Sequence, residues 1–426
     1  MQFDSGKLLM AWFNIKGTRS PLHQRVGFLL CAFLMLAWTC IPVTVNVAYS
    51  IQFGVTVYRL NILLTLLAIP VLILCCVFLR VRFHAYDALF ILFTVYCFFD
   101  TIVLTFGMNI DVVSQLIEFL TIFFGSYLWF KVATALEDAK SQALFCLFVF
   151  VSVFVAAQLL FYGGFSGNAS WGSATSDRGF TTVGYATASA MLLFSGMTVS
   201  FSQFKRFGSS VYLLTTLVIF AGILVSMTRA SISMALLYFF IVALLSPLDS
   251  KVKFVICVTL IVILVVCSQP ELVDNLAARF FTDNSSGSDA ERELYRSIGL
   301  GAFSESPFFG KGAGVSFTSI SHESIYIPEL PNPHNQYIAL LVESGLVGMV
   351  LLVASVVTLI VEERLIDGAT FQYALGFLIV VLVGSLFEVY IMRDIRTSLT
   401  FWLPLAYLWT QAKRRHSIAG DKDGSH

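Results

Sequence analysis

Long apolar stretches recur along the whole chain and restrict its fold more than any other feature. About twenty apolar residues in a helix cross the hydrocarbon core of a bilayer, and a helix satisfies its own backbone hydrogen bonds there. Hydrophobic residues make up 58% of the 426 residues and charged residues only 12%, whereas soluble domains carry roughly 25% charged residues. We therefore predict an all-α integral membrane protein with about twelve transmembrane helices.

The apolar stretches that we assign as membrane spans share a length near that of a bilayer crossing. By residue number they are 26–47, 60–79, 86–106, 115–135, 143–162, 182–203, 210–228, 232–247, 253–268, 337–361, 371–391 and 398–411. One long polar loop, 269–336, separates the ninth span from the tenth. The predicted organisation is thus 1–268 with helices 1 to 9, 269–336 as a loop with short helices, and 337–426 with helices 10 to 12 and a cytoplasmic tail.

The distribution of basic residues predicts the orientation of these spans. With the N-terminus in the cytoplasm, 17 of the 26 Lys and Arg residues fall in cytoplasmic segments and nine on the other side. This asymmetry agrees with the positive-inside rule. Twelve spans place both termini on one side, so the loop 269–336 is predicted to be extracytoplasmic.

Composition also argues against several functions. The formal net charge is zero, which gives no general attraction to nucleic acid. All eight cysteines lie in apolar stretches, so neither a disulfide framework nor a thiolate metal site is indicated. We expect no metal, no cofactor and no nucleic-acid partner.

Ionisable residues in or at the edge of apolar stretches are the first candidates for function, because a charge at membrane depth is costly. They are Asp100, Glu118, Arg229, Glu343 and Glu388. Asp100 and Glu118 can equally lie near helix ends and reach interfacial water. Arg229 stands at a predicted outer helix end among serines and a threonine, surroundings that suit an anionic group.

Within the loop, Ser288 to Glu291 has the form of a capping box, which predicts a helix start just before Arg292. Arg292 and Arg296, four residues apart, would share one helical face. Two guanidinium groups near a helix N-terminus can bind a phosphate or diphosphate. The alternative is a solvated helix whose arginines pair with neighbouring glutamates.

The remaining loop features are a glycine-rich run and a histidine. The run Gly310 to Gly314 fits neither a dinucleotide fingerprint nor a nucleotide P-loop, so a plain turn is favoured. His334 lies directly before a predicted helix, with Asn335 able to cap or orient it. A histidine there can act as general base on a sugar hydroxyl, because its unperturbed pKa lies near neutrality. The alternative is an interfacial histidine that only forms hydrogen bonds.

Three motifs in order carry a family resemblance. They are Arg292-Glu-Leu-Tyr-Arg-Ser-Ile-Gly-Leu-Gly-Ala-Phe303, Ser306-Pro-Phe-Phe-Gly-Lys-Gly312 and Pro333-His-Asn-Gln-Tyr-Ile-Ala-Leu-Leu-Val-Glu-Ser-Gly-Leu-Val-Gly348. Together they resemble the bacterial O-antigen ligase/polymerase family over roughly residues 225–350. The family often has tryptophan where Tyr295 stands, a departure that touches no catalytic role.

The resemblance implies an inverting glycosyltransferase of the bacterial inner membrane that uses no nucleotide sugar and no metal. It implies a donor glycan linked to undecaprenyl diphosphate, an active site facing the periplasm and contact with membrane lipid. Carried over residue by residue, it implies catalytic roles for Arg229, Arg292 and His334. Arg296, Asn335 and Glu343 are then candidate substrate-binding residues.

Two acceptors agree with the resemblance. The loop 269–336 holds nine acidic and four basic residues, a net charge of −5, which would repel the phosphorylated lipid A core that a ligase needs. We therefore favour a polymerase, whose acceptor is another lipid-linked glycan and whose partners can include a chain-length regulator. A ligase onto lipid A core is the first alternative. A lipid-linked sugar flippase or transporter of similar topology is the second.

Overall fold

The computed structural model describes residues 21–42, 45, 48–53, 56–104, 110–162, 181, 183, 186–226, 228–245, 286–314, 333–362, 371–387 and 395–423. In this part of the chain the elements are α2 (Leu22–Cys40), β1 (Ile51–Phe53), β2 (Thr56–Tyr58), α4 (Leu60–Phe78), α5 (Ala85–Leu104), α6 (Ile110–Ala135), α7 (Asp138–Tyr162), α8 (Ala186–Phe207), α9 (Ser210–Val225), α10 (Arg229–Leu245), α13 (Ser286–Glu305), α14 (Gln336–Glu362), α15 (Phe371–Gly384) and α16 (Ile395–Asp423). The prediction of a helical protein is confirmed, with one small antiparallel hairpin in addition.

Six of the described helices are long and apolar enough to cross a membrane: α2, α4, α5, α6, α7 and α14. Helices α9, α10 and α15 are apolar but shorter. The predicted span 253–268 lies outside the described residues. A multi-pass membrane protein is therefore supported, whereas the number of twelve spans and the side on which the loop lies stay predictions.

Several predicted boundaries were wrong. The first span was expected to reach residue 47, but α2 ends at Cys40, because proline at 42 disfavours helical backbone at Ile41. The β hairpin follows, with Ile51 opposite Tyr58. Helix α15 ends at Gly384, before the expected residue 391. Helix α16 runs from Ile395 to Asp423 and so exceeds the expected 398–411 at both ends.

The core of the bundle is formed by α8 and α16, both of which are richer in polar residues than the surrounding helices. Every side chain of α8 from Ala188 to Gln203 is buried, as are those of α16 from Ile395 to Leu408. Their hydroxyl groups are paired between helices: Ser195 Oγ donates to Thr400 O at 2.6 Å, and Ser126 Oγ lies 2.7 Å from Ser398 Oγ. Surrounding helices shield these polar contacts from lipid, which explains why the inner helices need less hydrophobicity.

Small residues allow the helices around α8 to approach closely. A Cβ atom on Gly222 of α9 would lie 2.7 Å from Ala156 Cβ of α7, and one on Gly196 of α8 would overlap Ser152 of α7. Close backbone approach at small residues is the usual means by which helices associate in a bilayer, where apolar surface alone gives no preference for protein over lipid.

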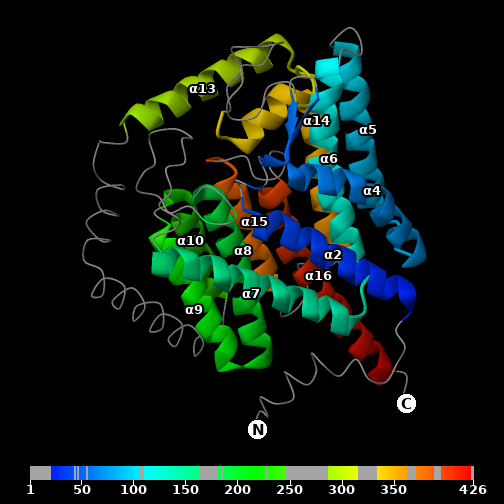
Figure 1. Cartoon of the computed structure of the whole chain (residues 1–426), viewed down its shortest axis with the longest axis vertical. Helices are drawn as coiled ribbons and strands as arrows, with labels where there is room; N and C mark the ends of the chain where they lie inside the picture. Colours follow the sequence, from blue (N-terminus) through cyan, green and yellow to red (C-terminus); the bar gives the residue numbers. More distant parts are fainter. Residues whose placement is uncertain are drawn as a thin grey trace.

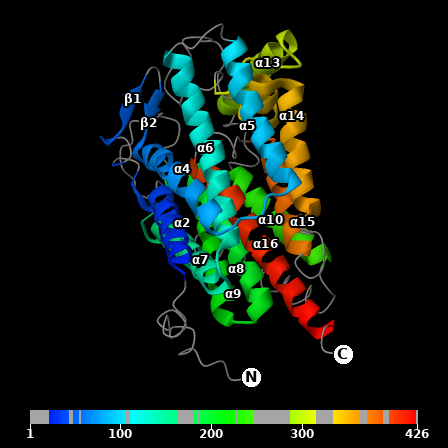
Figure 2. The same cartoon turned by 90° about the vertical axis from the view of Figure 1, so that its right-hand side faces the viewer.

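The helices that carry the loop lie together at one end of the molecule. Figure 1 shows α13 across the top, at the opposite end from the red C-terminal end of α16, and Figure 2 shows α14 beside α5 below it. Helix α13 packs against α14, and α14 packs along α5. The start of α14 and the end of α13 are thereby held over the ends of the membrane helices.

Candidate functional site

His334 lies immediately before α14 and has an unusual backbone conformation. Its φ angle is +47°, in the left-handed region that costs an L residue about 1 to 2 kcal/mol. The next residue, Asn335, caps the helix: its Oδ1 accepts hydrogen bonds from the amides of Tyr337 at 3.0 Å and Ile338 at 3.1 Å. The half-buried His334 side chain is thus set at a helix N-terminus by a fixed turn. The predicted capping role of Asn335 is confirmed.

The start of α14 is joined to the end of α15 by three hydrogen bonds. Asn335 Nδ2 donates to Leu386 O at 3.1 Å, and the amide of Gln336 donates to Ser385 O at 2.8 Å. The Tyr337 hydroxyl donates to Leu382 O at 2.8 Å. These donors satisfy one carbonyl group of the last turn of α15 and those of the two residues after it, and they fix the turn that contains His334.

Arg296 of α13 reaches the same carbonyl group as Asn335. Its Nη2 donates to Leu386 O at 3.3 Å, and its Nη1 lies 3.5 Å from Glu293 Oε2. The structure therefore brings Arg296 and Asn335 together, two residues that the sequence suggested separately. The pairing with Glu293 is the one that the solvated-helix alternative expected, and the carbonyl contact is additional to it.

Helix α13 was predicted in the right place but with the wrong start. It begins at Ser286 and not after Ser288, so the proposed capping box, Ser288 to Glu291, lies within the first two turns of the helix. Arg292 and Gly299 are seven residues apart and share one helical face. A Cβ on Gly299 would lie 2.8 Å from Ile338 Cγ2, so this face packs on the first turns of α14. The half-buried Arg292 is then about 10 Å from that contact along the helix axis.

Arg229 is the first residue of α10 and is half-buried. Helix α10 packs antiparallel to α15, because a Cβ on Gly384 would lie 2.6 Å from Met234 Sδ and one on Gly376 would lie 3.4 Å from the Tyr238 ring. The Arg229 end of α10 therefore lies beside the end of α15 that holds Asn335. All three predicted catalytic residues come from elements that meet around the end of α15 or the start of α14.

A break in α14 ties the glycine-rich motif to this region. Gly345 has φ +61° and ψ −166°, which interrupts the helix. The segment 306–312 pairs with the interruption through four backbone hydrogen bonds. The amides of residues 311 and 312 donate to the carbonyls of residues 342 and 343 at 2.7 and 3.0 Å, respectively. In the other direction, the amides of residues 346 and 347 donate to the carbonyls of residues 307 and 308 at 2.9 and 3.1 Å. The groups released by the break are thus satisfied.

Two glycines and one tyrosine make this pairing possible. A Cβ on Gly345 would overlap Phe308 O, and one on Gly310 would lie 2.7 Å from the Glu343 carbonyl carbon. The Tyr96 hydroxyl of α5 donates to Ser344 O at 2.8 Å and lies 3.3 Å from Phe309 O. The glycine-rich run is therefore a turn, as predicted, and in addition it fixes the His334 half of α14 to α13 and α5.

Glu343 and Lys311 do not join His334. Glu343 is 3% exposed and lies seven residues beyond Gln336, at the break and about 10 Å along the helix axis. The Lys311 side chain points to Glu305 at 2.6 Å, and this hydrogen bond lowers the pKa of the exposed Glu305 carboxyl group.

Sequence analysis missed one residue of interest, Arg396. It is the second residue of α16, is 2% exposed and donates through Nη1 to Val183 O. A buried arginine that ties the first turn of α16 to the chain before α8 is unusual, because long charged side chains are rarely fully buried. Its position directly before an apolar stretch could have indicated this role. We counted it only as one of the nine basic residues on the outer side.

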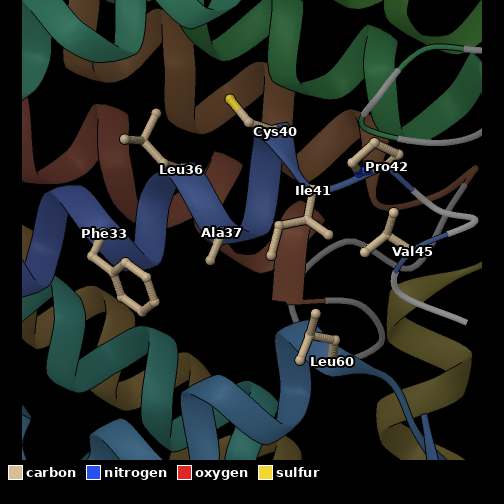
Figure 3. A pocket seen from close by; sticks show the side chains of 8 residues that line it. All are labelled: Phe33, Leu36, Ala37, Cys40, Ile41, Pro42, Val45 and Leu60. Atoms are coloured by element: carbon tan, nitrogen blue, oxygen red, sulfur yellow. The ribbon is translucent and has the colours of Figure 1, made fainter. Parts of the chain in front are cut away.

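The pocket drawn in Figure 3 has a volume of about 400 Å³ and lies away from these residues, between the end of α2 and the start of α4. Its lining is apolar: Phe33, Leu36, Ala37, Cys40, Ile41, Pro42, Val45 and Leu60. These side chains can contact a hydrocarbon chain but offer no acid or base for catalysis.

Comparison with known proteins agrees with the resemblance seen in the motifs. Residues 214–353 match the family model described as O-antigen ligase. No curated protein matches the chain. The six candidate residues, from Arg229 to Glu343, all fall inside the matched segment, as do α10, α13 and the break in α14. Residues 214–353 of this chain are therefore similar to the O-antigen ligase family.

Proposed function

We propose that this chain is a membrane glycosyltransferase of the O-antigen ligase or polymerase type. It transfers a glycan from undecaprenyl diphosphate to a hydroxyl group of an acceptor sugar. The observation that carries the proposal is the turn at His334, where a histidine in left-handed backbone conformation is fixed by the Asn335 cap and the shared Leu386 carbonyl. Strained residues that the surrounding structure fixes cluster at functional sites.

The proposed reaction is a direct displacement at the anomeric carbon. His334 takes the proton from the acceptor hydroxyl, and that oxygen forms the new glycosidic bond. The bond between the anomeric carbon and the diphosphate oxygen breaks, and the diphosphate leaves with the electron pair. Attack from the face opposite the leaving group inverts the configuration. The proton taken by His334 passes to water after the products leave.

Arg292 and Arg229 are proposed to bind the diphosphate of the donor. Negative charge develops on this group as the bond breaks, and fixed guanidinium groups at a water-poor interface stabilise it without a metal ion. Support comes from their helices: α13 packs on the first turns of α14, and the Arg229 end of α10 lies beside the end of α15. Arg296 and Asn335 set the geometry through Leu386 O, and binding of substrate by Arg296, Asn335 and Glu343 stays a prediction.

The proposed location is the bacterial inner membrane, with the site facing the periplasm. The distribution of basic residues supports this orientation, since 17 of 26 lie in segments assigned to the cytoplasm. The donor, a lipid-linked glycan, is then supplied on the same side as the loop.

The decisive experiment for the reaction class uses the purified protein in detergent with a lipid-linked glycan. Formation of a new glycosidic bond and release of undecaprenyl diphosphate support the proposal. Binding of the donor without any new bond would favour the flippase or transporter alternative, because such proteins move their substrate unchanged.

A polymerase is favoured over a ligase because the loop 269–336 carries a net charge of −5. An acidic surface repels a phosphorylated lipid A core over about one Debye length, ~8 Å, whereas an uncharged acceptor sugar is not affected. The test is deletion of the gene followed by analysis of carrier-linked glycan. Accumulation of single repeat units supports polymerisation, and accumulation of long polymer on the carrier would show that ligation was the missing step.

A further inference from the structure

A second pocket lies at the end of the molecule where α2 begins and α4 ends. Its volume is about 490 Å³, and it is lined by His23, Val77, Phe78, Leu79 and Arg80. A cationic side chain and a histidine thus line the pocket together with three apolar side chains. Both helices are long and apolar enough to cross a membrane, and Figure 2 shows them side by side. The pocket therefore opens where the ends of two membrane helices meet water.

Arg80 occupies a position at which glycine is the usual residue. The amides of Arg80 and Val81 donate to Val77 O and Cys76 O, both at 3.0 Å, which is the hydrogen-bond pattern of a Schellman cap. Arg80 is the residue with left-handed backbone in this cap, with φ +51°. A side chain at this position strains the backbone, and residues held in such conformations cluster at functional sites.

Arg80 is the cationic residue that lines the pocket, and two acidic side chains near this end of the molecule are paired with lysines. The acidic side chains of Asp87 and Glu137 are held by Lys131 at 2.9 Å and by Lys140 at 2.7 Å. The start of α2 is attached to the same region, because Gln24 Oε1 accepts a hydrogen bond from the Glu137 amide at 2.9 Å. The guanidinium of Arg80 is exposed, so it can meet an anion at the interface.

The apolar side chains next to the pocket are exposed. Val77 is 65% exposed, Phe78 62% and Leu74 52%. In a membrane these side chains contact acyl chains. A ligand that contacts both kinds of side chain carries a phosphate group and a hydrocarbon chain, which is the structure of a phospholipid.

We propose that this pocket binds one anionic phospholipid, with its phosphodiester group on Arg80 and His23 and an acyl chain along Val77 and Phe78. The inference concerns residues far from the His334 turn and does not depend on the proposed transferase activity. Guanidinium and phosphate groups form strong bidentate contacts. The bound lipid bridges α2 and α4 and stabilises their packing.

The test uses the full-length protein in nanodiscs of phosphatidylcholine with an increasing fraction of phosphatidylglycerol. For the wild type we expect the melting temperature to rise with phosphatidylglycerol, and native mass spectrometry to show one anionic lipid retained. In Arg80→Gly the cap gains its preferred residue, so the melting temperature in pure phosphatidylcholine should equal or exceed that of the wild type. The rise with phosphatidylglycerol and the retained lipid should both be lost.

Arg59→Gln is the matched control, because Arg59 precedes the opposite end of the same helix α4; it should keep the rise. If the glycine variant does not fold, Arg80→Asn replaces it, because asparagine tolerates left-handed backbone. This variant should likewise lose the rise in melting temperature and the retained lipid. An unchanged response to phosphatidylglycerol in the Arg80 variant that folds would overturn the proposal. So would an equal, Arg80-dependent rise with inorganic phosphate alone, because the ligand would then be a soluble anion.

Discussion

Charged side chains at the two ends of α5 and α14 are held in different ways. At one end, which we call the Asp87 end, Asp87 and Lys131 form an ion pair of 2.9 Å with side chains only 4% and 8% exposed. The Tyr127 hydroxyl donates to Asp87, Lys131 also donates to Tyr86 at 3.0 Å, and the His84 amide donates to Asp87 at 2.8 Å. Both charges are paired inside the protein.

At the other end, which we call the His334 end, the arginines are less deeply buried, and one of them, Arg296, is attached through a backbone carbonyl. Arg296 is 28% exposed and bonds to Leu386 O, while Arg292 and Arg229 are half-buried. A closed network of paired charges stabilises packing and leaves little capacity for a ligand. Guanidinium groups at an accessible helix end can instead bind an anion. The comparison predicts loss of stability from changes at the Asp87 end and loss of activity from changes at the His334 end.

Lys131→Met should have the largest effect on the fold. It leaves the buried Asp87 carboxylate without its cation, which typically costs about 3 to 5 kcal/mol. The yield of folded protein and its melting temperature in detergent should fall sharply, while transfer per folded molecule stays unchanged. Lys140→Met, which breaks the more exposed pair with Glu137, is the control and should change the melting temperature little. Equal effects of the two variants would contradict the comparison.

Arg292→Lys and Arg229→Lys should lower transfer activity and leave stability unchanged, the reverse of the effect expected for Lys131→Met. Each keeps the charge but loses the bidentate geometry that a diphosphate requires. We expect transfer to fall on the order of 10- to 100-fold, about 1.4 to 2.8 kcal/mol of transition-state stabilisation, at an unchanged melting temperature. Arg82→Lys, near the Asp87 end, is the control. Near-full activity with unchanged donor affinity in both variants would exclude the proposed diphosphate site.

Tyr96→Phe should have a moderate effect on both stability and transfer activity, because it removes the hydroxyl group that joins α5 to the break in α14. One lost hydrogen bond corresponds to about 1 kcal/mol of unfolding free energy, and the His334 half of α14 becomes less fixed. We expect a small fall in melting temperature and a larger fall in turnover than in apparent donor affinity. The exposed Tyr49 provides a Tyr→Phe control. A stability loss without any change in turnover would limit Tyr96 to a structural role.

Lys311→Gln should have the smallest effect. Lys311 pairs with the exposed Glu305, and exposed pairs contribute little. Because this hydrogen bond lowers the pKa of Glu305, its contribution is present at neutral pH and is lost as the pH falls through that lowered pKa. Wild type and variant should therefore have similar melting temperatures at neutral pH that converge in acid. A large difference at neutral pH would indicate that Lys311 belongs to the functional region.

The helices were largely predictable because apolar stretches of bilayer length leave few alternatives. The break in α14 was not predictable, because Gly345 lies inside an apolar stretch and its partner segment, 306–312, is more than thirty residues away in sequence. The shortening of α2 was readable in hindsight from Pro42. The hairpin at Ile51–Tyr58 carried no clear signal, since three residues per strand are too few for a periodic pattern.

The candidate residues were found through their chemistry and motifs, whereas their connections required the structure. Nothing in the sequence indicates that Arg296 and Asn335 share Leu386 O, because a backbone carbonyl has no residue type to signal it. Buried Arg396 was passed over for the opposite reason: its residue type suggested an exposed interface, and only tertiary packing shows that it is buried.

Proton transfer from the acceptor to His334 is tested most directly with purified wild type and His334→Ala in a transfer assay. His322→Ala, the other histidine of the loop, is the control. We predict that His334→Ala keeps its melting temperature and loses transfer on the order of 10²- to 10⁴-fold, while the control retains activity. Normal transfer by folded His334→Ala would contradict the account and remove this residue from the mechanism.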